Sequence, residues 1–173
     1  MIGAGAEARR AKAGGPYNHG MKKRADRPPA PPPTALLDER GLPIVGELAR
    51  VARGADAPRV KLEGAMEILF GAYGESDREF SGLFLHGWVR AREDKQFRLT
   101  LAWHREQIRL SLQDILAEGM ASGVFRSDLE AGALAAVIVG TAEGCLLQSA
   151  TQGGAVTAEQ LVRTLLELVI TGA

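Results

Sequence analysis

Cysteine and histidine are scarce in this sequence, and their scarcity excludes several kinds of site. Cys145 is the only cysteine in 173 residues, so an internal disulfide is impossible and a reducing compartment is favoured. The three histidines are His19, His86 and His104, and none stands at the spacing of a metal site. We therefore predict a cytoplasmic protein without a bound metal or cofactor.

Catalytic motifs are missing as well. The sequence has no Gly-x-Ser-x-Gly elbow, no phosphate-binding loop and no His-Glu-x-x-His pair. Its first residues lack the apolar run of a signal peptide. The 21 basic residues balance the 21 acidic ones, so overall charge indicates no class of partner. We predict no catalytic residue, and an enzyme built on a helical bundle stays as the last alternative.

Composition and local charge divide the chain near Thr34. Residues 1–33 hold seven basic and two acidic residues (net +5), and the other 140 residues hold 14 basic and 19 acidic ones (net −5). The first segment is rich in Ala, Gly and Pro and buries too little apolar surface to offset its ordering entropy. We predict a disordered basic tail over 1–33 and one folded domain over 34–173. A weak nucleic-acid contact is the alternative function of the tail.

The folded part is expected to be all-α, because no alternating run is long enough for a strand. Three capping boxes predict helix starts at Ser76, Ser127 and Thr157, each followed three residues later by Glu or Gln. Pro43 suits the first turn of a helix. The pattern predicts about six helices. The first two start near Pro43 and Pro58, and the other four span 76–92, 94–121, 128–150 and 157–171.

The helix at 94–121 has two apolar stripes, which predicts that it packs on two sides and is central. The first stripe holds Phe97, Leu101, Ile108, Leu112, Ile115 and Leu116, and the second holds Leu99, Trp103 and Leu110.

A tight corner is predicted after this helix. Gly123 stands where a helix end needs a left-handed residue, which glycine adopts without a Cβ clash. Val124 and Phe125 are expected to fold back onto the helix just ended, and Ser127 to start the next one. The two flanking helices should therefore lie antiparallel.

The segment 131–150 is almost uncharged, with Glu143 as its one charged residue. A helix that is apolar all round must be buried all round. A membrane span is disfavoured by Glu143 and by the absence of a basic flank. The alternatives are the core of a monomer or a partner chain, and we predict a dimer interface. Its expected residues are Ala136, Gly140, Glu143, Gly144, Leu147, Leu161, Leu165 and Leu168.

From about Leu36 to its end the chain resembles a known family, by helix order over most of this length and more specifically at the corner. The stretch ILAEGMASGVFRSDLEAGALAAVIVGTAEGCLLQ is similar to the last third of TetR-type transcriptional repressors, in which a long helix ends in such a corner and a small-residue helix follows. The resemblance implies an effector-binding domain of about six helices that forms a homodimer. Its last two helices are expected to build an intermolecular four-helix bundle.

The start of the chain departs from this pattern. Family members begin with a three-helix head that carries a helix-turn-helix and contacts DNA. Residues 1–33 are too short and too poor in apolar residues for such a head. One hypothesis is that the gene is truncated or that residues 1–33 are read in a shifted frame. The other is a stand-alone dimerisation module that pairs with a full-length regulator. Direct DNA binding by this chain is not expected, because no helix-turn-helix is visible in it.

The resemblance also implies a site for a small apolar effector inside the helical domain. The site is expected among the helices that start near 58, 76, 94 and 128, where the larger side chains gather. The alternative is that these side chains form only the hydrophobic core. The expected ligand-binding residues are Met66, Phe70, Tyr73, Phe84, Trp88, Trp103, His104 and Gln107.

Overall fold

The computed structural model describes residues 33–74, 78–149 and 156–170, and these form six helices. No strand occurs in these three ranges, so the predicted all-α class is confirmed. The predicted tail over 1–33 lies almost wholly outside the described residues. The helices are α1 (Pro33–Ala52), α2 (Pro58–Gly74), α3 (Arg78–Arg90), α4 (Lys95–Ala121), α5 (Ala131–Ser149) and α6 (Ala158–Val169).

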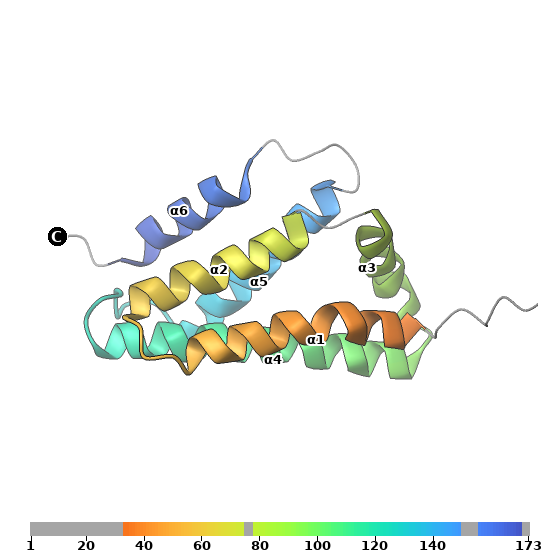
Figure 1. The fold of residues 1–173 in the computed structure, drawn as a ribbon, viewed down its shortest axis with the longest axis horizontal. Helices are drawn as coiled ribbons and strands as arrows, with labels where there is room; N and C mark the ends of the chain where they lie inside the picture. Colours follow the sequence, from red (N-terminus) through yellow and green to blue (C-terminus); the bar gives the residue numbers. More distant parts are fainter. Residues whose placement is uncertain (1–32, 75–77, 150–155, 171–173) are drawn as a thin grey trace, which may run out of the picture. The chain divides into compact units, whose positions relative to one another are not determined.

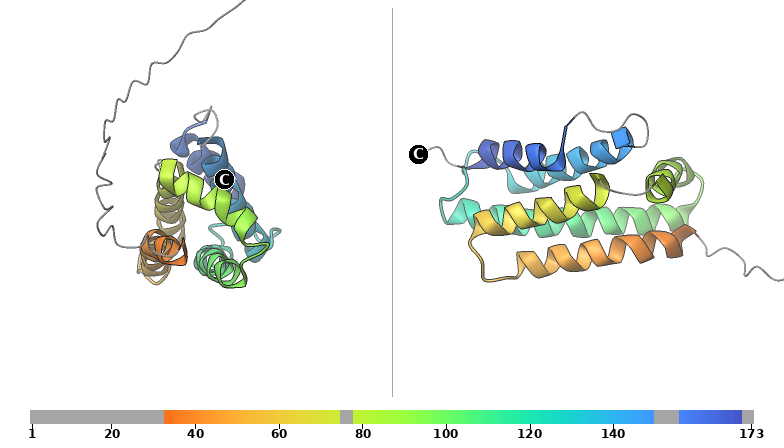
Figure 2. Two further views of the ribbon diagram at one scale, coloured as in Figure 1. Left: turned by 90° about the vertical axis from the view of Figure 1, so that its right-hand side faces the viewer. Right: turned by 45° about the horizontal axis from the view of Figure 1, so that its top comes forward.

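Helices α1 and α4 lie side by side and run in the same direction (Figure 1). Helix α2 packs on both and also contacts α5 and α6, while α3 stands near the end at which α4 begins (Figure 2). The largest fully buried side chains come from α1, α2, α4 and the corner before α5. They are Phe70, Phe97, Phe125, Leu37, Leu48, Leu62, Met66, Leu69, Ile108, Leu112, Ile115 and Leu116.

Helix α1 begins ten residues earlier than the sequence pattern predicted. Pro43 was expected in a first turn, but it lies inside the helix on an exposed face. Proline removes one backbone hydrogen bond there. The helix continues because Leu37 and Leu48, on either side of Pro43, are both buried in the core. Tertiary packing therefore outweighs the local preference of proline.

Lys61 of α2 joins the ends of three helices. Its Nζ donates to the carbonyl oxygen of Ala52 in α1 at 3.3 Å and to Oε2 of Glu118 in α4 at 2.8 Å. The Lys61 side chain is buried, while Glu118 stays partly exposed. A buried ammonium needs such partners, so this contact fixes how α2 starts against α1 and α4.

The first apolar stripe of α4 is buried as predicted, and the second is not. Phe97, Leu101 and the rest of that stripe belong to the core. By contrast, Leu99, Trp103 and Leu110 are exposed on the outer face of α4. The second stripe has no packing partner in the single chain, but α4 contacts α1, α2, α3 and α5, so the prediction that it is central is confirmed.

The corner after α4 is confirmed. Gly123 has a φ of 73°, and the backbone N–H groups of Val124 and Phe125 both donate to the carbonyl oxygen of Gly119. The Phe125 ring is buried against Gly119. The chain then runs back along α5, antiparallel to α4 (Figure 2).

The corner is also held from the far end of the sequence. Phe125 and Ile170 form an isolated antiparallel bridge, and the N–H of Arg126 donates to the carbonyl oxygen of Val169 at 3.0 Å. The residue that follows α6 thus pairs with the corner that follows α4. This long-range pairing has no local sequence signal.

The three predicted capping boxes have different outcomes. Thr157 caps α6 as predicted, with the Thr157 hydroxyl and the Gln160 side chain bonding reciprocally. Ser127 does not start α5, because the helix begins at Ala131 and the Glu130 carboxylate accepts from its first N–H groups. Arg126 and Asp128 form an ion pair in the intervening turn. Ser76 lies outside the described residues.

Candidate functional site

Glu143, the one charged residue of α5, is buried in the middle of that helix. Its side chain is 9% exposed and pairs with Arg105 of α4, whose side chain is 38% exposed. Arg105 Nη2 donates to Oε2 of Glu143 at 2.9 Å, and Arg105 Nε donates to Oε1 at 2.5 Å. Because a buried carboxylate without a partner is costly, this bidentate pair fixes α5 against α4.

Aromatic side chains from two other helices surround the pair. The Trp88 ring of α3 lies over the Arg105 guanidinium, with 5.0 Å from the ring centroid to Cζ. Tyr73 of α2 is buried, and its ring meets Phe84 of α3 edge-on at 5.5 Å between centroids. Burial raises the pKa of Tyr73 strongly, the charge of Glu143 raises it further, and Arg105 opposes both. Four helices therefore meet at this ion pair.

An open cleft of about 510 Å³ lies beside the pair, between the end of α3 and the first turns of α4. Leu101 is nearly buried at this cleft, while Trp88 and Arg105 are partly exposed. Three arginines and four uncharged residues line it. They are Arg92, Arg98 and Arg105 together with Trp88, Ala91, Leu101 and Ala102.

The residues predicted to bind a ligand separate into three groups. The first group, Met66, Phe70, Tyr73 and Phe84, is buried in the core. Trp88 lines the cleft. The third group, Trp103, His104 and Gln107, lies on another flank of α4, where the rings of Trp103 and His104 are 5.2 Å apart between centroids. The structure thus brings Tyr73 and Trp88 toward one ion pair, with Phe84 against the Tyr73 ring, and leaves the third group elsewhere.

His104 belongs to the contact between α1 and α4. Its buried ring lies against Gly41, where a Cβ would collide with the imidazole. Nε2 is 3.0 Å from Oδ1 of Asp38, but the pair lacks hydrogen-bond geometry, and Nδ1 has no partner among the described residues. Burial lowers the pKa of His104, and Asp38 opposes that shift. This histidine is a structural residue of the α1–α4 contact.

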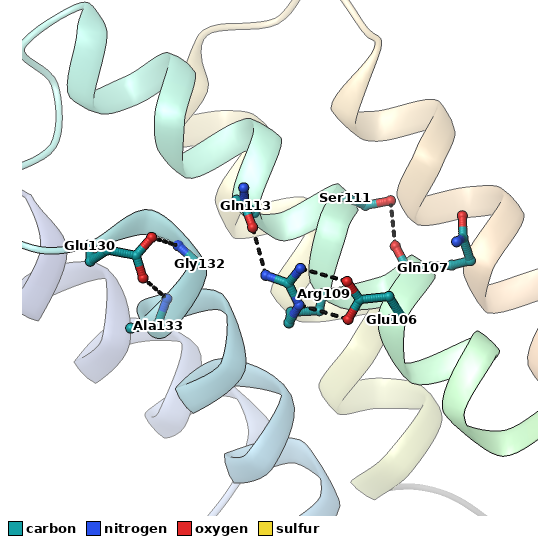
Figure 3. Close-up of polar contacts among 8 residues, drawn as sticks. All are labelled: Glu106, Gln107, Arg109, Ser111, Gln113, Glu130, Gly132 and Ala133. Atoms are coloured by element: carbon teal, nitrogen blue, oxygen red, sulfur yellow. Dashed lines mark hydrogen bonds and ion pairs between the residues drawn. The ribbon is translucent and has the colours of Figure 1, made fainter. Parts of the chain in front are cut away.

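Two further sets of polar contacts lie where α4 passes the start of α5. Arg109 donates to both Glu106 oxygens and to Gln113 Oε1, and the Glu130 carboxylate accepts from the N–H groups of Gly132 and Ala133 (Figure 3). A Cβ on Gly132 would lie 3.0 Å from Gln113 Oε1, so glycine permits this close approach. The start of α5 therefore lies close against this part of α4.

The residues predicted for a dimer interface occupy three environments. Glu143 and Leu165 are buried within the single chain, and Glu143 is engaged by Arg105. Gly144 and Leu161 are half-buried. Four others, Ala136, Gly140, Leu147 and Leu168, are exposed together with Val137.

Sequence reasoning did not identify Arg105 as a residue of the site. A signal was available, because a single carboxylate inside an apolar helix must find a cation. That rule shows that Glu143 has a partner, but it does not say which of the arginines of α4 faces it.

Neither metal ligands nor membrane anchoring stand out in the described part of the chain. No three His, Cys, Asp or Glu side chains in it are grouped as metal ligands would be. One helix is long and apolar enough to cross a membrane by length and composition, over Ala131–Gln148 within α5. The cores of soluble proteins contain such helices as well, so this observation alone does not indicate a membrane protein.

Six helices with this corner and this small-residue helix form the C-terminal domain of a TetR-type transcriptional regulator. The family model of the BetI-type transcriptional repressor, C-terminal, matches residues 58–171, which is more than half of the chain. The chain belongs to this family. Regulator domains of this type are in general not enzymes. No curated protein and no solved structure matches the chain.

Proposed function

We propose that this chain is the effector-binding and dimerisation part of a TetR-type repressor, acting as a cytoplasmic homodimer. The observation that carries the proposal is the outward face of α5. Ala136, Val137, Gly140 and Leu147 are exposed there, and no charged residue interrupts them. An exposed apolar strip of this kind is typical of a protein–protein interface.

Small residues make this face suited to another helix. An added Cβ at Gly140 or Gly144 would meet nothing within 4 Å in the single chain, so neither glycine is required by the chain's own packing. Glycine inside a helix is unfavourable by about 0.5–1 kcal/mol relative to alanine. Close approach of a second copy supplies the reason for keeping glycine there. Leu168 of α6 is also exposed and would extend the interface.

The arrangement supports an effector role for the cleft. Arg105 faces both the cleft and Glu143, and Glu143 belongs to the helix that carries the dimer face. Helix α1 runs along α4. A ligand that binds one arrangement of α4 better than another would shift the population of the dimer between two states. Operator recognition belongs to the family's helix-turn-helix and is not assigned to these helices.

Sedimentation equilibrium of the full chain at micromolar concentration tests the dimer. We expect twice the chain mass of 18.4 kDa for the wild type and one chain mass for Gly140→Leu. Gly46→Leu in α1 is the matched control, because its added Cβ also meets nothing within 4 Å, and it should remain dimeric. A dimeric Gly140→Leu variant would remove Gly140 from the interface.

A monomeric wild type would contradict the homodimer. It would favour the alternative, a module that pairs with a full-length regulator. Mixing the chain with such a regulator would then yield a mixed dimer.

A further inference from the structure

The cleft between α3 and α4 carries an excess of positive charge. Arg92, Arg98 and Arg105 line it, and no acidic residue does. Glu143 engages Arg105 from the side of α5. Within the described residues, no carboxylate lies at ion-pair distance from Arg92 or Arg98, and Arg98 Nη1 donates only to the carbonyl oxygen of Ala91, at 3.3 Å.

The acidic residues that follow Arg92 in the sequence do not neutralise this positive charge. Glu93 and Asp94 border a neighbouring depression, together with His86 and Lys95. Asp94 caps α4 by accepting from the N–H of Phe97, and it also accepts from Arg90 Nε at 3.1 Å. The hydrogen bond from Phe97 and the one from Arg90 keep the pKa of Asp94 low. Its charge is therefore committed outside the cleft.

The rest of the cleft is apolar. Trp88 presents a large ring, Leu101 is nearly buried, and Ala91 and Ala102 are small enough to leave room. Cations do not fit this environment, because they would meet two arginines without counter-charges. A neutral apolar molecule would leave both guanidinium groups unused. A carboxylate on an apolar body fits both the arginines and the apolar lining. Guanidinium groups bind carboxylates with paired hydrogen bonds, and the body packs on the apolar side chains.

We propose that the effector of this cleft is an organic anion, a carboxylate carried on an aromatic or aliphatic body. This inference rests on the proposed function and names the class of ligand for that same site. Arg92 and Arg98 bind the carboxylate, and the body lies against Trp88 and Leu101. The bound charge then lies within electrostatic reach of Arg105, whose guanidinium fixes α5 through Glu143.

Isothermal titration calorimetry on the full chain tests the charge of the ligand with three probes of one shape. The probes are 1-naphthylacetate, the neutral 1-naphthylacetamide and the cationic 1-naphthylmethylamine. We expect the acid to bind at least tenfold more tightly than the amide, and the amine to bind most weakly. The preference for the acid should decrease with added salt, because the two arginines are exposed.

Substitutions locate the site without disturbing the core. Arg92→Gln and Arg98→Gln should each weaken binding of the acid about threefold to tenfold, and the double variant should bind acid and amide equally. Arg53→Gln is the matched control, since it removes one exposed arginine outside the cleft and should change nothing. Circular dichroism confirms that each variant is folded.

The outcomes separate this inference from the proposed function. Equal binding of acid and amide by the wild type, or tighter binding of the amine, would overturn the anionic class and leave an effector site in place. Binding of none of the three probes would overturn the inference as well. An acid preference that survives in the double arginine variant would place the anion elsewhere. Dimerisation is decided independently by sedimentation.

Discussion

Gly119 of α4 lies directly beneath the ring of Phe125. A Cβ at position 119 would collide with this ring. Even the ring's Cγ would lie only 2.9 Å from that Cβ, and two other ring atoms would lie closer. The ring cannot easily move, because the Phe125 N–H is bonded to the Gly119 carbonyl oxygen and the residue bridges to Ile170. The corner between α4 and α5 therefore requires glycine at this helical position.

Gly119→Ala is expected to destabilise the protein in spite of the higher helix propensity of alanine. Overpacking of this kind costs roughly 1–3 kcal/mol. Gly46→Ala in α1 is the matched control, because its Cβ would meet nothing and it should stabilise the protein by about 0.5–1 kcal/mol. Urea denaturation at one protein concentration gives both values. Equal stabilisation by the two substitutions would show that Phe125 gives way.

The start of α5 provides a second prediction. Glu130 accepts from the N–H groups of Gly132 and Ala133, whereas Ser127 stands in the turn before the helix. Glu130→Ala should cost about 1 kcal/mol, as expected for loss of a helix cap, and Ser127→Ala should change stability by less than about 0.5 kcal/mol. The same denaturation measurement decides between the two residues. A larger loss for Ser127→Ala would restore the capping box that the sequence pattern predicted.

A third prediction concerns pH and the contact between α1 and α4. Burial holds the pKa of His104 below its ordinary value of 6.5, with Asp38 opposing. The unfolded chain therefore binds a proton more readily than the folded one, so this contribution to stability is present above pH 6.5 and is lost as pH falls toward the lowered pKa. Stability should decline on acidification below pH 6.5.

His104→Gln should flatten that decline, even though it lowers stability overall by disturbing the packing against Gly41. Unfolding free energies measured between pH 5 and 7.5 give the slopes. If the His104 variant keeps the wild-type slope, groups other than His104 cause it.

Much of the fold follows from local sequence signals. Gly123 predicts the corner because only a residue without Cβ adopts a positive φ freely, and Thr157 with Gln160 predicts the start of α6. The buried stripe beginning with Phe97 and Leu101 follows from helical periodicity. Each of these signals is local, so neighbouring residues are enough to read it.

The remaining features depend on long-range contacts. The extent of α1 across Pro43 is set by packing of Leu37 and Leu48, and the bridge from Phe125 to Ile170 joins residues far apart in sequence. The same limit applies to the candidate site. Trp88 was identified by its size, but its position over Arg105 depends on how α3 crosses α4.

The buried ion pair between Arg105 and Glu143 joins α4, which lines the cleft, to α5, which carries the proposed dimer face. A double-mutant cycle with Arg105→Met and Glu143→Gln tests it most directly, through the unfolding free energies of four proteins. A fully buried pair that loses one partner costs about 3–5 kcal/mol, and the partial exposure of Arg105 reduces our expectation to roughly 2–3 kcal/mol for Arg105→Met. We expect the double variant to lose less unfolding free energy than the two single variants lose in sum, by at least about 1 kcal/mol. Additivity within about 0.5 kcal/mol would contradict the account, because it would mean that the two side chains do not interact.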